Sequence, residues 1–251
     1  PLHPLQEQRD SVADWRQIGL GVMGLADMLI KLKVKYGSAT SRSVIESIGH
    51  ELIMTALETS SILAASHGPY PKFNRDYVIR TPFFKNLDSG DMNDLRFQSL
   101  YDDVCKYGLR NSQLLTCAPT GSIATMLGVS TGCEPIFATS YTRKTESLVN
   151  EERYYKVYTP IIKELIDKGF SEEALPEYVV TSEQIPYRER IKVQATLQKF
   201  IDASISSTIN LPESATIDDV ETIYRLAWEE GLKGITVYRS GCKRGAVLSK
   251  N

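Results

Sequence analysis

A strand–helix–strand pattern near the C-terminus constrains the fold more than any other feature of the sequence. Residues 206–211 ("SSTINL") and Gly234–Tyr238 ("GITVY") are short apolar runs rich in β-branched side chains, so each predicts a strand. The segment between them, Thr216–Glu230, repeats apolar residues at helical spacing and predicts a helix. Strands that alternate with helices in this way indicate an α/β fold.

The predicted helix at 216–230 has clear start and stop signals. Thr216 and Asp219 predict a capping box, and further acidic residues in the first turn suit the helix dipole. Gly231 stands where a residue in the left-handed conformation commonly ends a helix. The apolar residues of this helix form one stripe: Ile217, Val220, Ile223, Tyr224, Ala227 and Trp228.

The rest of the chain predicts further helices and short strands. We expect helices at 20–33, 43–65, 91–107, 121–127, 154–168 and 187–203. We expect strands at 112–118, 135–141 and 178–181, and loops at 68–90 and 142–152. Because the short apolar strands do not alternate with polar residues, they are expected to be buried and largely parallel. No break in composition marks a linker, so we predict a single domain over residues 1–251.

Composition excludes several classes of function. The chain has 251 residues, 42% of them hydrophobic and 24% charged, with a net charge of -2, as in ordinary soluble globular proteins. It has no cluster of basic residues for nucleic acid and no membrane-spanning run, so we expect neither nucleic acid nor a membrane as a partner. It has no signal peptide, so we expect a cytoplasmic location. The sequence does not start with a methionine, which suggests that it is part of a longer chain.

The cysteines and histidines do not form a metal site or a disulfide framework. None of the four cysteines belongs to a Cys-x-x-Cys pair, and the three histidines are scattered. We therefore predict no metal site and free thiols in a reducing compartment. The cysteines are Cys105, Cys117, Cys133 and Cys242.

Gly19, Gly21 and Gly24 satisfy the Gly-x-Gly-x-x-Gly pattern of dinucleotide-binding proteins. That site also needs a strand just before the glycines and an acidic residue about 20 positions later. Segment 10–18 is polar and poorly strand-like, and segment 35–43 supplies neither strand nor acid. We interpret the glycines as helix-packing residues, and an NAD(P)-dependent dehydrogenase using Gly19–Gly24 stands as an alternative.

The stretch Thr116–Leu127, "TCAPTGSIATML", is a candidate binding site without any charged residue. A strand that leads into Pro-Thr-Gly-Ser at a helix start directs free backbone N–H groups at one point. Gly121 would allow close approach, and the Thr120 and Ser122 hydroxyls could add donors, which makes a workable phosphate cradle. The alternative, favoured by these residues taken alone, is a plain helix capped by Thr120.

Two other segments carry candidate chemistry. In "STGCEPIFA" (130–138), Glu134 could orient a ligand or a neighbouring loop, although such an acid is more often a local hydrogen-bond acceptor. Cys133 beside it has no neighbouring histidine in sequence, so a catalytic thiol is disfavoured. Segment 238–245, "YRSGCKRG", carries three basic residues and could contact an anion or be a solvated turn.

Four segments together resemble the catalytic large chain of ribonucleotide reductases. They occur in the family's order and near its spacing, and they span nearly the whole chain. Ala118–Ser122 ("APTGS") is most similar to the adenosylcobalamin-dependent class II branch, and Tyr238 stands alone where class I chains carry two adjacent tyrosines. The segments are "GLGVMGLADML", "HGPYPKF", "LTCAPTGSIATMLGVSTGCEPIFATSYTRKTES" and "IDASISSTINLPESATIDDVETIYRLAWEEGLKGITVYRSGCKRG".

The resemblance implies a fold and a binding site. The fold would be a ten-stranded α/β barrel of two antiparallel halves, of which this chain is mainly the second half. The family's matching loop holds the phosphates of the substrate nucleotide, a ribonucleoside di- or triphosphate. That role carries over to Thr120, Gly121, Ser122 and Ile123, with Ser122 as the expected hydroxyl donor. In this context the phosphate cradle is favoured over the plain capped helix.

The resemblance also implies what the chain lacks. In the family a cysteine thiyl radical removes the ribose 3′ hydrogen, the 2′-hydroxyl leaves as water, and a cysteine pair supplies electrons. The motif with the radical cysteine is expected upstream of Pro1, so we assign no catalytic residue and predict no turnover from this chain alone. The full-length enzyme would use adenosylcobalamin. The expected partner is the remainder of the catalytic chain, with a homodimer as one option, and a catalytically silent assembly or relic module is the alternative.

Overall fold

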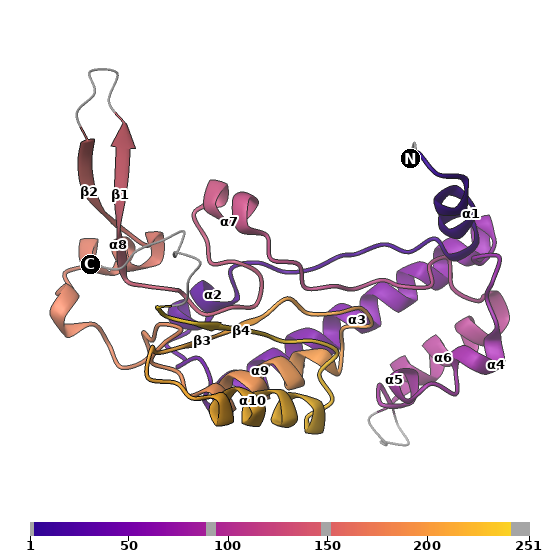
Figure 1. Cartoon of the computed structure of the whole chain (residues 1–251). Helices are drawn as coiled ribbons and strands as arrows, with labels where there is room; N and C mark the ends of the chain where they lie inside the picture. The colour runs from indigo at the N-terminus through magenta and orange to yellow at the C-terminus, as the bar shows by residue number, and fades with distance from the viewer. Residues whose placement is uncertain (1–2, 89–93, 147–151, 242–251) are drawn as a thin grey trace. The chain divides into compact units, whose positions relative to one another are not determined.

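The computed structural model (Figure 1) describes residues 3–88, 94–146 and 152–241. The chain divides into two compact units. Each unit combines segments that lie far apart in sequence. Unit 1 comprises Pro1–Gly21, Ser43–Cys117 and Thr196–Ile205, and unit 2 comprises Val22–Arg42, Ala118–Ala195 and Ser206–Asn251. No helix among the described residues is long and apolar enough to cross a membrane. The assignment of 1–251 to one domain stays a prediction.

Unit 1 is built mainly from helices. They are α1 (Gln6–Trp15), α3 (Ala39–His67), α4 (Arg75–Val78), α5 (Pro82–Lys85) and α6 (Leu95–Tyr107), with the first residues of α3 belonging to unit 2. The helices predicted at 43–65 and 91–107 are confirmed as α3 and α6, apart from residues 91–93, which lie outside the described residues. The loop predicted at 68–90 also contains α4 and α5, each capped by a side-chain oxygen, from Asn74 and Thr81.

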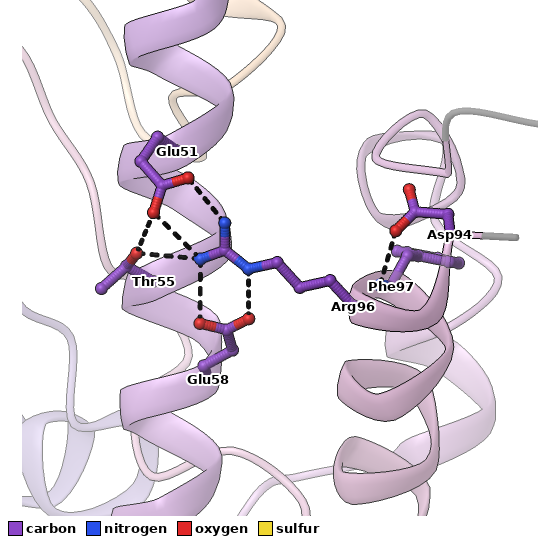
Figure 2. Close-up of polar contacts among 6 residues, drawn as sticks. All are labelled: Glu51, Thr55, Glu58, Asp94, Arg96 and Phe97. Atoms are coloured by element: carbon purple, nitrogen blue, oxygen red, sulfur yellow. Dashed lines mark hydrogen bonds and ion pairs between the residues drawn. The ribbon is translucent and has the colours of Figure 1, made fainter. Parts of the chain in front are cut away.

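An arginine on α6 joins that helix to α3. Figure 2 shows the Arg96 guanidinium between the carboxylates of Glu51 and Glu58, with both oxygens of each carboxylate accepting from it. The Thr55 hydroxyl accepts one further bond. Paired, parallel N–H···O bonds of this kind fix geometry as well as adding energy, so this Arg96 cluster sets how the two helices meet.

Three extended segments of unit 1 run side by side in parallel. Leu20 forms a parallel bridge with Leu115, and Cys117 forms one with Ile205. The Asp202 carboxylate accepts from two consecutive N–H groups at the start of the middle segment, at 2.7 Å each. The strand predicted at 112–118 is thus extended and paired in parallel, although its pairing is limited to single bridges.

The predicted helix 20–33 is wrong over its first third. Only Leu25–Lys31 (α2) is helical, because residues 19–21 are drawn into the parallel pairing. A Cβ atom on Gly21 would lie 2.3 Å from the Thr116 carbonyl oxygen, and one on Gly19 would lie 2.8 Å from the Thr116 methyl group. These two glycines permit two backbones to approach closely, so our helix-packing interpretation of them is incorrect.

The dinucleotide-binding alternative also loses its structural basis. Asp14 and Trp15 end helix α1, and the described residues 16–18 that follow form no strand. The fingerprint needs a strand directly before its first glycine, so Gly19–Gly24 does not present a Rossmann site.

Unit 2 contains a βαβ element, a β-hairpin and several further helices. Besides α2 they are α7 (Gly121–Leu127), β1 (Ser140–Glu146), β2 (Glu152–Tyr158), α8 (Pro160–Asp167), the 3-10 helix η1 (Glu172–Ala174), α9 (Tyr187–Gln198), β3 (Thr208–Leu211), α10 (Ile217–Glu229) and β4 (Thr236–Arg239). The helix α7 has the predicted bounds. The helix predicted at 187–203 is shorter, because α9 ends at Gln198, and its last three residues belong to unit 1.

The region between α7 and α9 differs most from expectation. β1 and β2 pair antiparallel, from Ser140 opposite Tyr158 to Glu146 opposite Glu152, where we predicted a loop and the first part of a helix. The strand predicted at 135–141 begins only at Ser140, and residues 178–181 form no strand. Tyrosine and valine in "ERYYKVY" favour a paired strand, and Pro160 then starts α8 at a position that needs no N–H donor.

The βαβ element is confirmed. β3 and β4 are parallel neighbours, with Ile209 opposite Val237. Thr216 and Asp219 make the reciprocal capping box, and Gly231 has a φ of 74°. Ile209 and Leu211 pack into one core cluster with Ile191 and Ile223.

The apolar stripe of α10 is only half buried. Ile223 and Ala227 are buried, whereas Ile217 is 85% exposed and Trp228 is 79% exposed. Helical spacing identifies an apolar face, and only the neighbouring elements determine how much of it is covered. The described strands form two two-stranded sheets, one antiparallel and one parallel, which establishes mixed α/β content without a closed barrel among the described residues.

Candidate functional site

The predicted phosphate-binding residues lie together at the N-terminus of α7 in unit 2. Thr120 is the residue before the helix, and Gly121, Ser122 and Ile123 form its first turn. The side chains of Ser122 and Ile123 are exposed, and a Cβ atom on Gly121 would meet no atom within 4 Å. A ligand could therefore reach the first turn of α7 from solvent.

Thr120 adopts an unusual backbone conformation that a neighbouring loop holds in place. Its φ is 52°, in the left-handed region that β-branched residues rarely occupy. Its hydroxyl oxygen accepts a bond of 2.8 Å from the Gly132 N–H instead of from the first turn of its own helix. The alternative of a plain helix capped by Thr120 is therefore wrong.

The first turn of α7 consequently has free donors and no competing negative charge. Helix geometry leaves the N–H groups of Gly121, Ser122 and Ile123 without intrahelical acceptors, and no side chain caps them. The first turn contains no acidic residue. An anion placed there would meet N–H donors and the positive end of the helix dipole, although seven residues make that dipole a short one.

The loop that holds Thr120 is itself fixed by two side chains that sequence reasoning missed. The buried Asp27 carboxylate accepts from the Ser130 N–H at 2.6 Å, and the Tyr36 hydroxyl donates to the Cys133 carbonyl at 2.6 Å. A charged residue inside the apolar run "GLADML" is a usable signal, because acids are rarely buried without a partner. Asp27 therefore secures the loop that positions Thr120.

Glu134 connects this loop to strand β3. Its carboxylate accepts from the Thr208 N–H at 2.6 Å, and an oxygen of the same carboxylate lies 3.8 Å from Arg190. Of the two interpretations of Glu134, orientation of a neighbouring segment is the one observed, and a local acceptor role is not. Cys133 is buried beside it.

Arg190, on α9, is almost fully buried, with 3% of its surface exposed. It donates to the Ser207 hydroxyl and the Thr208 carbonyl, and its guanidinium lies over the Tyr36 ring. Its Nε–H has no hydrogen-bond partner, and neither has the buried Ser130 hydroxyl. Buried polar groups are normally satisfied, so two orphan groups in one region mark it for attention.

A pocket of about 220 Å³ contains both residues with orphan atoms. Thr125 and Gly128 contribute to it from the end of α7, and Pro135, Phe137 and Tyr141 from the following segment. Apolar atoms make most of its wall, although nine of the lining residues carry polar side chains, among them Ser130, Glu134, Arg190 and Asn210. An apolar pocket with a few convergent polar groups is the usual form of a small-molecule site.

The basic segment 238–245 lies only partly within the described residues. Arg239 donates to the Glu213 and Ala215 carbonyls, which ties the end of β4 to the loop before α10. Lys243 and Arg244 fall outside the described residues. The anion-contact interpretation of this segment is therefore not supported by Arg239, whose donors serve the backbone.

Comparisons with known proteins identify the class of protein. The family profile "Ribonucleotide reductase, barrel domain" matches residues 2–238. The chain therefore belongs to this family, as its motifs implied.

Individual relatives are similar along almost the whole chain. It is 31% identical to the vitamin B12-dependent ribonucleoside-diphosphate reductase of Mycobacterium tuberculosis (strain CDC 1551 / Oshkosh), with 98% of this chain and 34% of that protein covered. It is 30% identical to the protein of the same name from Thermoplasma acidophilum, with 98% and 31% covered. It is 27% identical to the ribonucleoside-diphosphate reductase large subunit of Plasmodium falciparum (isolate Dd2), with 92% and 31% covered. The chain thus spans about a third of the length of these relatives.

Proposed function

We propose that this chain supplies the substrate phosphate site of a ribonucleotide reductase. Thr120, Gly121, Ser122 and Ile123 would hold the phosphates of a ribonucleoside di- or triphosphate. The observation that carries the proposal is the uncapped, exposed first turn of α7, on the residues that match the family's phosphate loop.

The contribution of each residue follows from its position. The N–H groups of the first turn would donate to phosphate oxygens, and the Ser122 hydroxyl would add a charge-assisted bond. Gly121 leaves the space that a phosphate needs near the backbone. Thr120, held by Gly132, would keep the helix start open because its side chain does not turn back to cap it.

The whole protein's reaction would be the reduction of ribonucleotides to deoxyribonucleotides. Two relatives are named as vitamin B12-dependent reductases, which supports adenosylcobalamin as the cofactor of the full-length protein. We further propose that this chain is mainly the second half of a ten-stranded α/β barrel completed by the remainder of the catalytic chain.

Adenosylcobalamin would supply the initiating radical in the full-length protein. The pocket beside α7, at about 220 Å³, is too small for a corrin ring. The residues at the start of α7 offer hydroxyl and N–H groups, which suit phosphate oxygens and are not cobalt ligands. We therefore assign no residue of this chain to the cofactor and derive no step through it.

Paired variants in the intact protein that carries this chain test the phosphate site. We expect Ser122→Ala to weaken nucleotide binding about tenfold, because a bond to a charged group is lost. Gly121→Glu should abolish binding, because it places a negative side chain where the phosphates would lie. Isothermal titration with ribonucleoside di- and triphosphates measures both effects and shows which phosphate number is preferred.

Matched controls separate binding from folding. Gly234, like Gly121, is exposed and has open space at its Cβ position, so Gly234→Glu should leave affinity unchanged. Ser43→Ala, an exposed serine of α3, is the control for Ser122→Ala. Unchanged affinity in both α7 variants would contradict the phosphate site.

A turnover assay on the isolated chain tests the remaining expectation. We expect none, because the resemblance places the radical cysteine upstream of Pro1. Formation of deoxyribonucleotide by the purified chain would overturn this expectation. A silent assembly or relic module predicts no nucleotide binding either, and the titration above distinguishes it.

A further inference from the structure

We propose that a second pocket of unit 2, between helices α2 and α8, binds an aromatic carboxylate. The ring would lie against Phe170 and Tyr178, and the carboxylate beside Lys33 and Lys168. No residue that lines this α2–α8 pocket also lines the pocket beside α7 or belongs to the phosphate loop. The inference therefore goes beyond the function proposed above and does not depend on it.

The α2–α8 pocket has the size and the walls of a small-molecule site. Its volume of about 490 Å³ lies within the roughly 300–1,000 Å³ that is typical of such sites. The buried residues Ile30, Ile161 and Leu165 line it. Phe170 and Tyr178 line it as well, and Phe170 is 40% exposed although it is a large apolar residue. A flat apolar ligand would cover aromatic surface that now faces water.

The charged residues of the pocket favour a negatively charged ligand. Three lysines and one glutamate line it, in a chain whose net charge is -2. The glutamate, Glu164, is already paired with Lys31 at 3.4 Å. Neither Lys33 nor Lys168 forms an ion pair with an acid among the described residues. Two cations therefore remain for an anion that enters the pocket.

Lys33 has a backbone conformation that usually belongs to glycine. Its φ is 57°, and it directly follows Leu32, the C-cap residue of α2, where a left-handed residue is most often glycine. An L side chain in this conformation costs roughly 1–2 kcal/mol. The stem of Lys33 lines the pocket, and such stems cover apolar surface while the charged end stays accessible. A lysine that is kept here against the backbone preference indicates a use for its side chain.

The helix ends at the pocket favour one negative charge over two. Lys31 is the last residue of α2, and Lys168 directly follows the last residue of α8. The C-terminal end of a helix carries partial negative charge, which opposes a phosphate more strongly than a carboxylate. The described lining residues include no arginine, the side chain that pairs with a phosphate through two parallel bonds. A carboxylate on an aromatic ring fits both the lysines and the apolar wall.

Four small probes test the ligand class in the intact protein that carries this chain. 2-Naphthoate combines ring and carboxylate, 2-naphthamide is its neutral counterpart, and acetate has the charge without the ring. By isothermal titration we expect 2-naphthoate to bind with a Kd below about 1 mM, 2-naphthamide about tenfold more weakly, and acetate not measurably. The fourth probe, 2-naphthyl phosphate, should displace bound 2-naphthoate no better than 2-naphthoate itself does.

Variants test whether the probes bind in the α2–α8 pocket. Phe170→Ala should weaken 2-naphthoate and 2-naphthamide alike, about fivefold, because both lose the same apolar contact. Lys168→Met keeps an apolar stem, so it should weaken 2-naphthoate about fivefold and leave 2-naphthamide within twofold. Tyr224→Ala and Lys35→Met are the matched controls, because both residues belong to unit 2, neither is buried and neither lines the pocket. They should leave both affinities unchanged.

Lys33→Gly separates ligand binding from folding. Glycine adopts the left-handed conformation without the cost that lysine bears, so the melting temperature should be equal to or above that of the wild type. The affinity for 2-naphthoate should nevertheless fall about fivefold, because one cation is lost. A role of Lys33 in folding alone predicts the opposite combination, a lower melting temperature with unchanged affinity.

The outcomes decide each part of the proposal. No binding of 2-naphthoate, or binding that is insensitive to both Phe170→Ala and Lys168→Met, would overturn the site. Equal affinities for 2-naphthoate and 2-naphthamide would overturn the carboxylate, and better displacement by 2-naphthyl phosphate would overturn the choice of a single charge. Weaker 2-naphthoate binding in Lys168→Met, with pyrophosphate binding unchanged, would support the site and show that it is independent of the phosphate loop.

Discussion

Arg96 in unit 1 and Arg190 in unit 2 are arginines in opposite environments, one exposed and fully paired and the other buried and incompletely paired. The side chain of Arg96 is 38% exposed, and the carboxylates of Glu51 and Glu58 pair with each of its nitrogens (Figure 2). Arg190 is 3% exposed, lies 3.8 Å from one carboxylate, and keeps one N–H without a partner.

The difference shows how burial changes the energetics of the same residue type. Water could serve the donors of Arg96 if the carboxylates were absent, so its contacts add modest stability and fix the approach of α6 to α3. Water cannot easily reach Arg190, so an incomplete set of partners there carries a cost that folding alone does not explain. Burial and an N–H without a hydrogen-bond partner, and not charge, distinguish Arg190 from Arg96.

The largest expected loss of stability comes from substitution of Arg190. Arg190→Met should lower the free energy of unfolding by about 2–3 kcal/mol, because Ser207 and Thr208 lose a donor and Glu134 loses its cation. The double variant Arg190→Met/Glu134→Gln should lose about 1 kcal/mol less than the sum of the single losses. Urea unfolding followed by circular dichroism measures all three. Strict additivity would show that the 3.8 Å pair contributes nothing.

A smaller effect is expected for the exposed arginine. Arg96→Met should cost about 1 kcal/mol, because surface ion pairs contribute little even when several meet. Most of that loss should disappear in about 1 M salt, where the screening length is near 3 Å. The loss caused by Arg190→Met should persist under the same conditions. If salt reduced the stability losses of Arg96→Met and Arg190→Met equally, the two arginines would not differ in their exposure to screening.

The smallest expected effect is a dependence of stability on pH. The bonds from Arg96, and then from Thr55, lower the pKa of Glu51 below its ordinary value. The carboxylate therefore contributes stability above the ordinary glutamate pKa of about 4.3, and loses it as pH falls toward the lower folded-state pKa. Glu51→Gln should flatten the melting-temperature profile in that acidic range.

The elements that sequence reasoning predicted correctly are those with strong local signals. The capping box of Thr216 and Asp219, the left-handed Gly231 and the bounds of α7 all depend on residues within a few positions. The phosphate-loop residues were predicted by resemblance. Gly121, Ser122 and Ile123 are exposed and Thr120 is half-buried, and their ligand stays a prediction.

The elements that sequence reasoning missed depend on distant partners. The hairpin of β1 and β2 exists because two segments pair, whereas "ERYYKVY" alone was assigned to a helix. Gly19 and Gly21 were misinterpreted because the residue that requires them, Thr116, lies almost a hundred residues away. Asp27 was missed because its partner, the Ser130 N–H, belongs to another loop.

The sequence by itself therefore determined the family, the βαβ element and the position of the candidate phosphate loop. Each of these can be recognised from short segments whose residues are contiguous. Only the tertiary structure decided that Thr120 does not cap its own helix, that Glu134 reaches β3, and that Arg190 is buried with an unpaired donor. These facts depend on which segments meet and on how much water they exclude, and both arise from packing across the folded chain.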